Sequence, residues 1–145
     1  MSRKPRVLVI CTGNSMRSQI AEAVLRMDLG DRIEVFSAGT HPGSVHPLAI
    51  AVLADIGYDA LQHRSKSVNE FLDTPMDLVI TVCDSAREAC PVFPGAHKTV
   101  HHGYPDPIRF SSPSEREELM AEIRDLMRRE LCALVIKELN LDEAR

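Results

Sequence analysis

The chain has 145 residues, a formal net charge of −4 and a sequence pI near 5.8. This length predicts a single domain, residues 1–145, with one sizeable core. The acidic balance gives no reason to expect nucleic acid or an anionic membrane surface as a partner. The longest apolar runs have the length of strands, so none is expected to span a membrane.

The N-terminus and the cysteines indicate a compartment. Residues 1–6 are basic but lead directly into a strand-like run rather than into the apolar core of a signal peptide, so we expect a cytoplasmic protein. In the cytoplasm, four cysteines are more often catalytic, metal-binding or buried than joined in structural disulfides.

Short β-branched runs alternate with longer patterns of helical spacing. In chain order we expect a strand at 6–10, a helix at 18–30, a strand at 33–37, helices at 46–57 and 67–72, strands at 77–82 and 99–102, and a helix from 112 to about 135. The short helix is expected to pack Phe71 and Leu72, and the last one starts with a capping box from Ser112 to Glu115. The alternation predicts an α/β protein, a three-layer α/β/α sandwich around a central four-stranded parallel sheet.

The stretch of residues 11–18 lies between the first strand and the first helix. Backbone N–H groups and the positive end of the helix dipole converge at such a place, which suits a tetrahedral oxyanion. The expected oxyanion-binding residues are Thr12, Gly13, Asn14, Ser15, Met16 and Arg17. Gly13 and Asn14 tolerate left-handed backbone, which helps to turn successive N–H groups to one side.

Three side chains of this stretch are expected to carry out chemistry. The positive environment favours the thiolate of Cys11, which is the nucleophilic form. Arg17 offers a planar, bidentate donor to two oxyanion oxygens. The hydroxyl of Ser18 can donate to the Cys11 thiolate, and a serine there also fits a plain helix N-cap. A chance Cys-x5-Arg spacing around a buried cysteine is the structural alternative.

Asp106 lies between two prolines, in the stretch Gly103-Tyr104-Pro105-Asp106-Pro107. Its expected role is that of a general acid, which protonates a departing oxygen once its loop folds over the anion. An aspartate before proline is also common in turns, so the functional interpretation depends on the nearby anion loop.

Two further cysteines, Cys83 and Cys90, follow the strand expected at 77–82. The carboxyl end of that strand places Cys83 at the same edge of the sheet as Cys11. We interpret the pair as a thiol relay, which needs a nucleophilic thiol, a resolving thiol and a final pair accessible to a reductant. A metal site is one alternative, although zinc ligands are more closely spaced, and two unrelated thiols are another.

The remaining cysteine and the histidines are expected to be structural. Cys132 lies among apolar residues of helical spacing, as a core residue would. His101 and His102 are interpreted as surface residues at a strand end, because no third ligand accompanies them. No metal site is therefore expected.

Together these residues resemble a known family. Cys-Thr-Gly-Asn-Ser-x-Arg-Ser after a strand, with a late Asp-Pro, is similar to the low-molecular-weight protein tyrosine phosphatases. The stretch 82–84 with 90–91 and Phe93-Pro94-Gly95 resembles the thioredoxin-coupled arsenate reductases built on that fold. The match runs from Val7 to about Asp106 by motif and onward by helix pattern, and it implies a low-molecular-weight phosphatase-like fold.

The resemblance implies an arsenate reductase that serves arsenic detoxification. Loop amides and Arg17 would hold arsenate, and Cys11 would attack arsenic while Asp106 protonates the leaving oxygen. Cys83 would then attack the Cys11 adduct, releasing arsenite, and Cys90 would resolve the Cys11–Cys83 disulfide. Thioredoxin would reduce the final Cys83–Cys90 disulfide. Phosphate and sulfate would compete as oxyanions, and residual phosphatase activity is compatible with the resemblance.

The chain departs from that family's pattern in two respects. Met16 stands just before the loop arginine where some members have another cysteine, but that position is not one of the three redox thiols. The second departure concerns a cation. Some members bind potassium near the loop through residues that match Asn14, Glu22 and Ser37, plus an acid. Lys66 stands where that acid aligns, and a lysine ammonium can occupy the place of the cation. We therefore expect no tightly bound cofactor, and Lys66 argues against potassium binding.

Other functions fit parts of the pattern. A tyrosine phosphatase that hydrolyses phosphomonoesters through a phosphocysteine at Cys11 needs neither later cysteine, but residues 108–110 lack the tyrosines that typically follow Asp-Pro in those enzymes. A reductase that uses a small-molecule thiol in place of the Cys83–Cys90 relay is a second alternative. A non-catalytic anion sensor, whose Cys11 only responds to oxidation, leaves Asp106 unexplained.

Overall fold

The central sheet consists of four parallel strands, β1 (Arg6–Cys11), β2 (Glu34–Gly39), β3 (Leu78–Thr81) and β4 (Thr99–His101). Their order across the sheet is β2–β1–β3–β4. The computed structural model describes residues 3–83, 93–107, 112 and 114–141. The expected four-stranded parallel sheet is confirmed.

The topology places a switch point at the carboxyl end of β1. The strand that follows β1 in the chain pairs with it on one side, and β3 pairs with it on the other. In register, Ile10 lies beside Ala38 of β2 and Thr81 of β3. Open parallel sheets bind ligands beyond the strand ends at such a point. The residues that follow Ile10 and Thr81 therefore lie where a ligand is expected.

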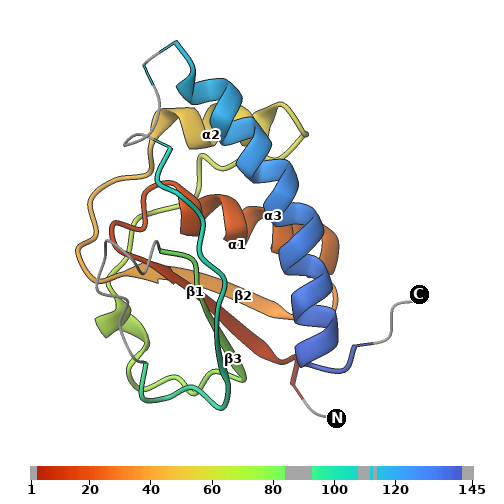
Figure 1. The fold of residues 1–145 in the computed structure, drawn as a ribbon. Helices are drawn as coiled ribbons and strands as arrows, with labels where there is room; N and C mark the ends of the chain where they lie inside the picture. The colour runs from red at the N-terminus through yellow and green to blue at the C-terminus, as the bar shows by residue number, and fades with distance from the viewer. Residues whose placement is uncertain (1–2, 84–92, 108–111, 113, 142–145) are drawn as a thin grey trace.

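Within the described residues, three α-helices cover one face of the sheet: α1 (Arg17–Leu29), α2 (Pro47–Ala54) and α3 (Arg116–Glu138). Helix α1 packs on β1 and β2, and α2 and α3 pack against α1 (Figure 1). On the opposite face, the 3-10 helix η1 (Val68–Phe71) and the buried ring of Phe93 contribute to a second core. In the described part of the chain, no helix is long and apolar enough to cross a membrane.

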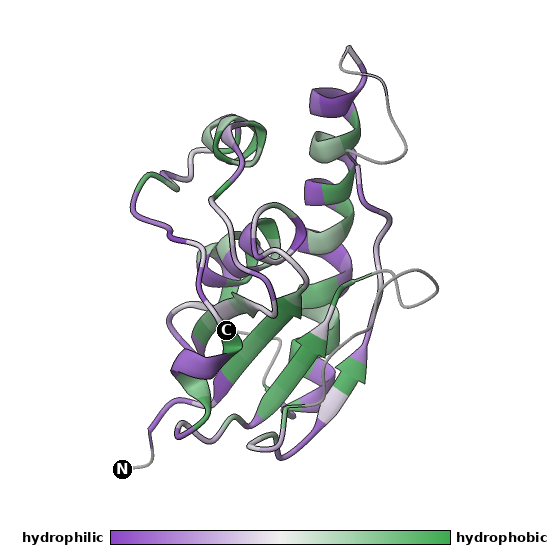
Figure 2. Cartoon of the chain, turned by 90° about the vertical axis from the view of Figure 1, so that its left-hand side faces the viewer, coloured by the Kyte–Doolittle hydropathy of each residue, from purple (hydrophilic) through white to green (hydrophobic). Residues whose placement is uncertain are grey.

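Both faces of β1 are buried, which explains why its sequence is apolar without alternation. Val7, Val9 and Cys11 belong to the core under the helices, whereas Leu8 and Ile10 belong to the core on the other face. Burying an aliphatic side chain of this size contributes roughly 1.5–3 kcal/mol relative to leaving it exposed. Figure 2 shows the strands as a hydrophobic centre of the chain.

Helix α2 ends at Ala54 rather than at 57, and two further details differ from the sequence-based expectation. Helix α3 begins at Arg116 rather than at 112, and the capping contact forms ahead of it, with Ser112 N and Oγ donating to Glu115 Oε1 at 3.1 and 2.7 Å. Phe71 packs on the second core as expected, but Leu72 is 49% exposed, so its expected burial is wrong. Leu72 comes directly after Phe71, the last residue of η1. Because a 3-10 helix has three residues per turn, adjacent side chains point in different directions, so Leu72 does not face the core that Phe71 contacts.

Candidate functional site

The loop of residues 12–16 joins β1 to α1 and holds its carbonyl groups away from its centre. The hydrogen bonds are His41 N to Thr12 O (2.9 Å), Gly43 N and Ser65 Oγ to Gly13 O (3.3 and 3.0 Å), Gln19 Nε2 to Asn14 O (3.0 Å), His46 N to Ser15 O (3.0 Å) and Ile20 N to Met16 O (2.8 Å). The N–H and C=O of a planar peptide point in opposite directions. Carbonyls tied outward therefore turn the loop N–H groups inward, as an anion-binding nest requires.

Backbone conformation and a close approach shape this loop. Asn14 has a φ of 47°, in the left-handed region that asparagine tolerates. Gly13, the other residue expected there, does not adopt a positive φ, so that expectation is wrong. At the end of β2, a Cβ on Gly39 would lie 2.5 Å from Thr12 O, so only glycine allows the loop to pack this closely.

The predicted nucleophile and its serine partner are in contact. Cys11 Sγ lies 2.9 Å from Ser18 Oγ, and both side chains are buried. Asn14 Nδ2 donates to the same Ser18 Oγ at 2.7 Å, which leaves the serine hydroxyl hydrogen to point toward sulfur. Helix α1 begins at Arg17 with Met16 at its N-cap, so Ser18 is not the cap that the sequence also allowed.

Arg17 links the start of α1 to the loop that carries Asp106. Its guanidinium is buried and Nη1 donates to Tyr104 O at 3.0 Å. Asp106 follows two residues later and is half-buried. The arginine therefore contacts the loop that carries the expected general acid.

Cys83 lies at the carboxyl end of the strand beside β1. Val82 N, one residue earlier, donates to Ile10 O at 2.9 Å, and the Cys83 side chain belongs to the same buried cluster as Cys11. Cys83 is disulfide-bonded, whereas Cys11 is a free thiol. Cys90 lies outside the described residues.

Cys132 and His102 both lie close to carboxylates of the fold, and the expectation for His102 is corrected. Cys132 is a free, half-buried thiol 3.6 Å from Asp28 Oδ2, and burial together with that carboxylate raises its pKa to about 12. His102 is half-buried and its Nε2 lies 2.9 Å from Glu130 Oε1, so it is more than a surface residue. Among the residues described, no three or more His, Cys, Asp or Glu side chains form a group that could hold a metal.

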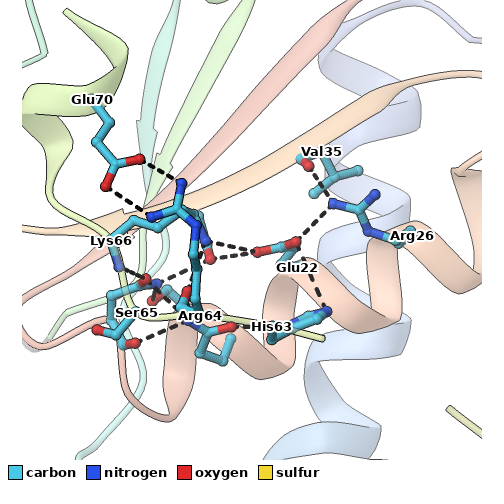
Figure 3. A network of polar contacts seen from close by, with 12 residues as sticks. Glu22, Arg26, Val35, His63, Arg64, Ser65, Lys66 and Glu70 are labelled. Carbon is cyan, nitrogen blue, oxygen red and sulfur yellow. Dashed lines mark hydrogen bonds and ion pairs between the residues drawn. The ribbon is translucent and has the colours of Figure 1, made fainter. Parts of the chain in front are cut away.

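A buried polar network extends from the loop to a carboxylate. Asn14 Nδ2 donates to Ser37 Oγ at 3.0 Å, and Ser37 Oγ donates to Glu22 Oε1 at 2.5 Å. Figure 3 shows Glu22 between two cations: Arg26 Nη2 donates to Oε2 at 2.7 Å, and Lys66 Nζ lies 3.8 Å from Oε1. Burial lowers the pKa of Lys66, and the charge of Glu22 opposes that effect.

The segment of residues 63–66 is hydrogen-bonded to the loop of residues 12–16 and to Gln19. Its sequence did not suggest this role. Its bonds to the loop and its surroundings are Gln19 Nε2 to Arg64 O (3.0 Å), Ser65 Oγ to Gly13 O (3.0 Å), Lys66 N to Asn14 Oδ1 (2.8 Å) and Gly39 N to Lys66 O (2.8 Å). His63 Nδ1 lies 2.8 Å from Gln19 Oε1, so this nitrogen carries the proton. Burial lowers the pKa of His63, which favours the neutral ring.

A comparison with known proteins places this site in a family. Residues 6–144 match the family described as low molecular weight phosphotyrosine protein phosphatase. The chain belongs to this family. The matched range includes the loop after β1 and the Asp-Pro sequence at Asp106.

Within this phosphatase family, the chain is similar to several arsenate reductases. A relative named arsenate reductase, from Halalkalibacterium halodurans, is 35% identical over 123 residues, which cover 84% of this chain and 88% of the relative. A structure of a thioredoxin-dependent arsenate reductase from Corynebacterium glutamicum is 29% identical with a TM-score of 0.67, covering 94% of this chain and 64% of that one. A structure of an arsenate reductase in the phosphate binding state is 25% identical with a TM-score of 0.74, covering 92% and 98%.

Proposed function

We propose that this protein is an arsenate reductase that uses thioredoxin as its reductant. The observation that carries the proposal is the position of Cys83, which follows the strand beside β1 and lies in the same buried cluster as Cys11. A phosphatase needs the thiol of Cys11 alone, whereas a reductase needs a second thiol that can form a disulfide with the first. The arsenate reductases among its relatives support the same function.

The first step is attack on the bound oxyanion. The inward N–H groups of the loop and the guanidinium of Arg17 hold arsenate. The hydroxyl of Ser18 donates to the Cys11 thiolate, which attacks arsenic and forms an S–As bond. Asp106 supplies the proton with which the displaced oxygen leaves as water.

The next steps move two electrons from sulfur to arsenic. The thiolate of Cys83 attacks Cys11 Sγ, the S–As bond breaks, and its electron pair stays on arsenic, which leaves as arsenite. The thiolate of Cys90 then attacks Cys83 Sγ and releases the Cys11 thiolate. The dithiol of thioredoxin reduces the Cys83–Cys90 disulfide and becomes a disulfide itself, so electrons and bonds balance over the cycle.

The thiol states in the structure agree with the end of this sequence of steps. Cys83 is disulfide-bonded, and both Cys11 and Cys132 are free. A thioredoxin-dependent cycle fits the cytoplasm, where that system keeps thiols reduced. Phosphate and sulfate have the same tetrahedral shape as arsenate, so both are expected to compete for the loop.

The residues beside Glu22 do not fit a potassium ion. The ammonium of Lys66 is 3.8 Å from Glu22 Oε1, so a cation held by Asn14, Glu22 and Ser37 would face a positive charge at short range. No step of the proposed reaction needs the ion. Lys66 and Arg26 together supply positive charge near this carboxylate.

A single-turnover experiment tests the proposed function. Fully reduced protein is mixed with arsenate without any reductant, and arsenite and free thiols are counted. We expect about one arsenite per chain and the loss of two thiols, because one disulfide supplies the two electrons. Cys83→Ser is expected to release no arsenite, since nothing then attacks the Cys11 adduct.

Cys132→Ser is the matched control, because it removes a thiol that takes no part in the relay. It should release as much arsenite as the wild type. Wild-type protein that forms no arsenite but hydrolyses an aryl phosphate would contradict the reductase and identify a tyrosine phosphatase instead.

A further inference from the structure

The loop that carries Asp106 is tied to helix α3 through one carboxylate. Glu130 Oε1 accepts a hydrogen bond from Tyr104 Oη at 2.9 Å and lies 2.9 Å from His102 Nε2. The rings of His102 and Tyr104 also contact each other, with centroids 5.2 Å apart. Two residues of the loop are thereby fastened to the same side chain.

Tyr104 is the part of this tie that reaches the site. Its side chain is 3% exposed, and its backbone N–H donates to Val82 O at 3.0 Å. Burial raises the pKa of Tyr104, and the hydrogen bond to Glu130 adds to that effect, so the phenol keeps its proton and stays a donor. The ring and backbone of Tyr104 are both fixed.

The carbonyl of the same residue orients the expected anion-binding arginine. Arg17 Nη1 donates to Tyr104 O at 3.0 Å. A carbonyl acceptor orients the planar guanidinium but carries no net charge to compete with a bound anion. A shift of the Tyr104 backbone would therefore change the direction of the Arg17 donors.

We propose that Tyr104 and Glu130 are positioning residues that hold Arg17 aligned on the oxyanion. The proposal rests on the anion-binding loop of the proposed function. Neither residue touches the anion: Glu130 fixes the phenol of Tyr104, and the carbonyl of Tyr104 fixes Arg17. The consequence is that the carboxylate of Glu130 on α3 controls the affinity of the loop of residues 12–16 for the oxyanion, although it does not touch that loop.

The gap between these residues in the chain makes the link a property of the fold. Glu130 is 26 positions from Tyr104, and Tyr104 is 87 positions from Arg17. A Cβ on Gly103 would lie 2.8 Å from Cys83 O, so glycine allows this loop to pass close to the end of β3. The link from Glu130 to Arg17 thus depends on how this loop, which follows β4 in the chain, packs between the end of β3 and helix α3.

The test measures the dissociation constant of inorganic phosphate, which needs no turnover. We expect Glu130→Ala to raise this constant roughly three- to tenfold, the effect of losing one hydrogen bond that orients a ligand group. Glu130→Gln keeps an acceptor for the phenol and should restore most of the affinity. Glu138→Ala is the matched control, since it removes an ion pair with Lys98 (2.8 Å) from the same helix.

A double-mutant cycle with Arg17→Ala separates positioning from general damage. We expect Glu130→Ala to cause no further loss of phosphate affinity once Arg17 is absent. An equal loss in both backgrounds, or a loss no larger than that of Glu138→Ala, would overturn the positioning role. If Glu130→Ala does not fold, Tyr104→Phe decides the question in the same cycle. Unchanged phosphate affinity in Arg17→Ala alone would instead reject the anion site of the proposed function.

Discussion

At the residue scale, Lys66 places a positive charge beside Glu22, where a site for a metal cation would have negative or neutral ligands. Its ammonium lies 3.8 Å from Glu22 Oε1 and donates to Arg64 O at 2.9 Å. Burial lowers the pKa of Lys66, but the neighbouring Glu22 carboxylate stabilises the charged form. The side chain therefore acts as an internal cation beside the network that reaches Asn14.

This role predicts that the protein does not respond to potassium. We expect the melting temperature of the wild type to be the same in potassium chloride and tetramethylammonium chloride at equal ionic strength. Lys66→Asp places a second carboxylate beside Glu22, so potassium should then raise the melting temperature by a few degrees. Differential scanning calorimetry measures both.

Lys98→Asp makes the same charge change at an exposed ion pair and serves as the control. It should stay indifferent to potassium. A wild-type protein that potassium stabilises more than tetramethylammonium does would show that Lys66 leaves room for the ion.

The residues of the loop itself were predictable because they are neighbours in the sequence. Cys11, Arg17 and Ser18 lie within one strand–loop–helix unit, whose geometry follows from the unit alone. Gln19 and His63 meet at 2.8 Å across 44 positions of the chain, and no local pattern indicates such a contact.

At the element scale, the segment of residues 63–66 supports the loop of residues 12–16 through hydrogen bonds. Its bonds to Gly13 and Asn14 hold two loop residues in place. His63 connects the segment to Gln19 through Nδ1, and its Nε2 accepts from Tyr58 Oη at 2.7 Å. Both bonds require the neutral ring with the proton on Nδ1.

The neutral His63 predicts a pH dependence of stability. Burial lowers its pKa below 6.5, Arg26 and Lys66 act in the same direction, and Glu22, with Oε2 3.9 Å from Nε2, opposes them. The unfolded chain therefore binds the proton more readily than the folded one, so this contribution is complete above pH 6.5 and is lost as the pH falls below that value.

Urea unfolding at a series of pH values measures this effect. The two pH values to compare are about 7.5 and about 5.5, roughly one unit on either side of the ordinary histidine pKa. Between them, the free energy of unfolding of His63→Asn should fall less than that of the wild type. His41→Asn, a change at an exposed histidine, should follow the wild type. Equal pH dependence in His63→Asn and the wild type would mean that folding does not lower the pKa of His63.

The elements were predictable where the hydrophobic pattern determines them. The buried strands β1 and β3 are unbroken apolar runs, and both were expected within two residues of their observed bounds. The start of α3 was expected too early, because Ser112 and Glu115 form their contact before the helix begins. Sequence spacing identifies such a contact but not the residue at which the helix starts.

At the scale of the whole molecule, the strand order brings the thiols together. Cys11 and Cys83 are 72 positions apart, yet Cys11 ends β1 and Cys83 lies two residues beyond the adjacent parallel strand β3. The rule that ligands bind at strand ends predicted a shared edge of the sheet, but not that β3 would pair directly with β1. The tie from Glu130 to Arg17 was beyond sequence analysis, because it joins α3, a loop and α1.

Steady-state reduction of arsenate tests the three-cysteine relay most directly. NADPH consumption is followed with thioredoxin and thioredoxin reductase, comparing the wild type with Cys90→Ser. We predict continuous turnover by the wild type, and a single round by Cys90→Ser that ends with Cys11 bound to Cys83. Continuous turnover by Cys90→Ser at the wild-type rate would contradict the relay.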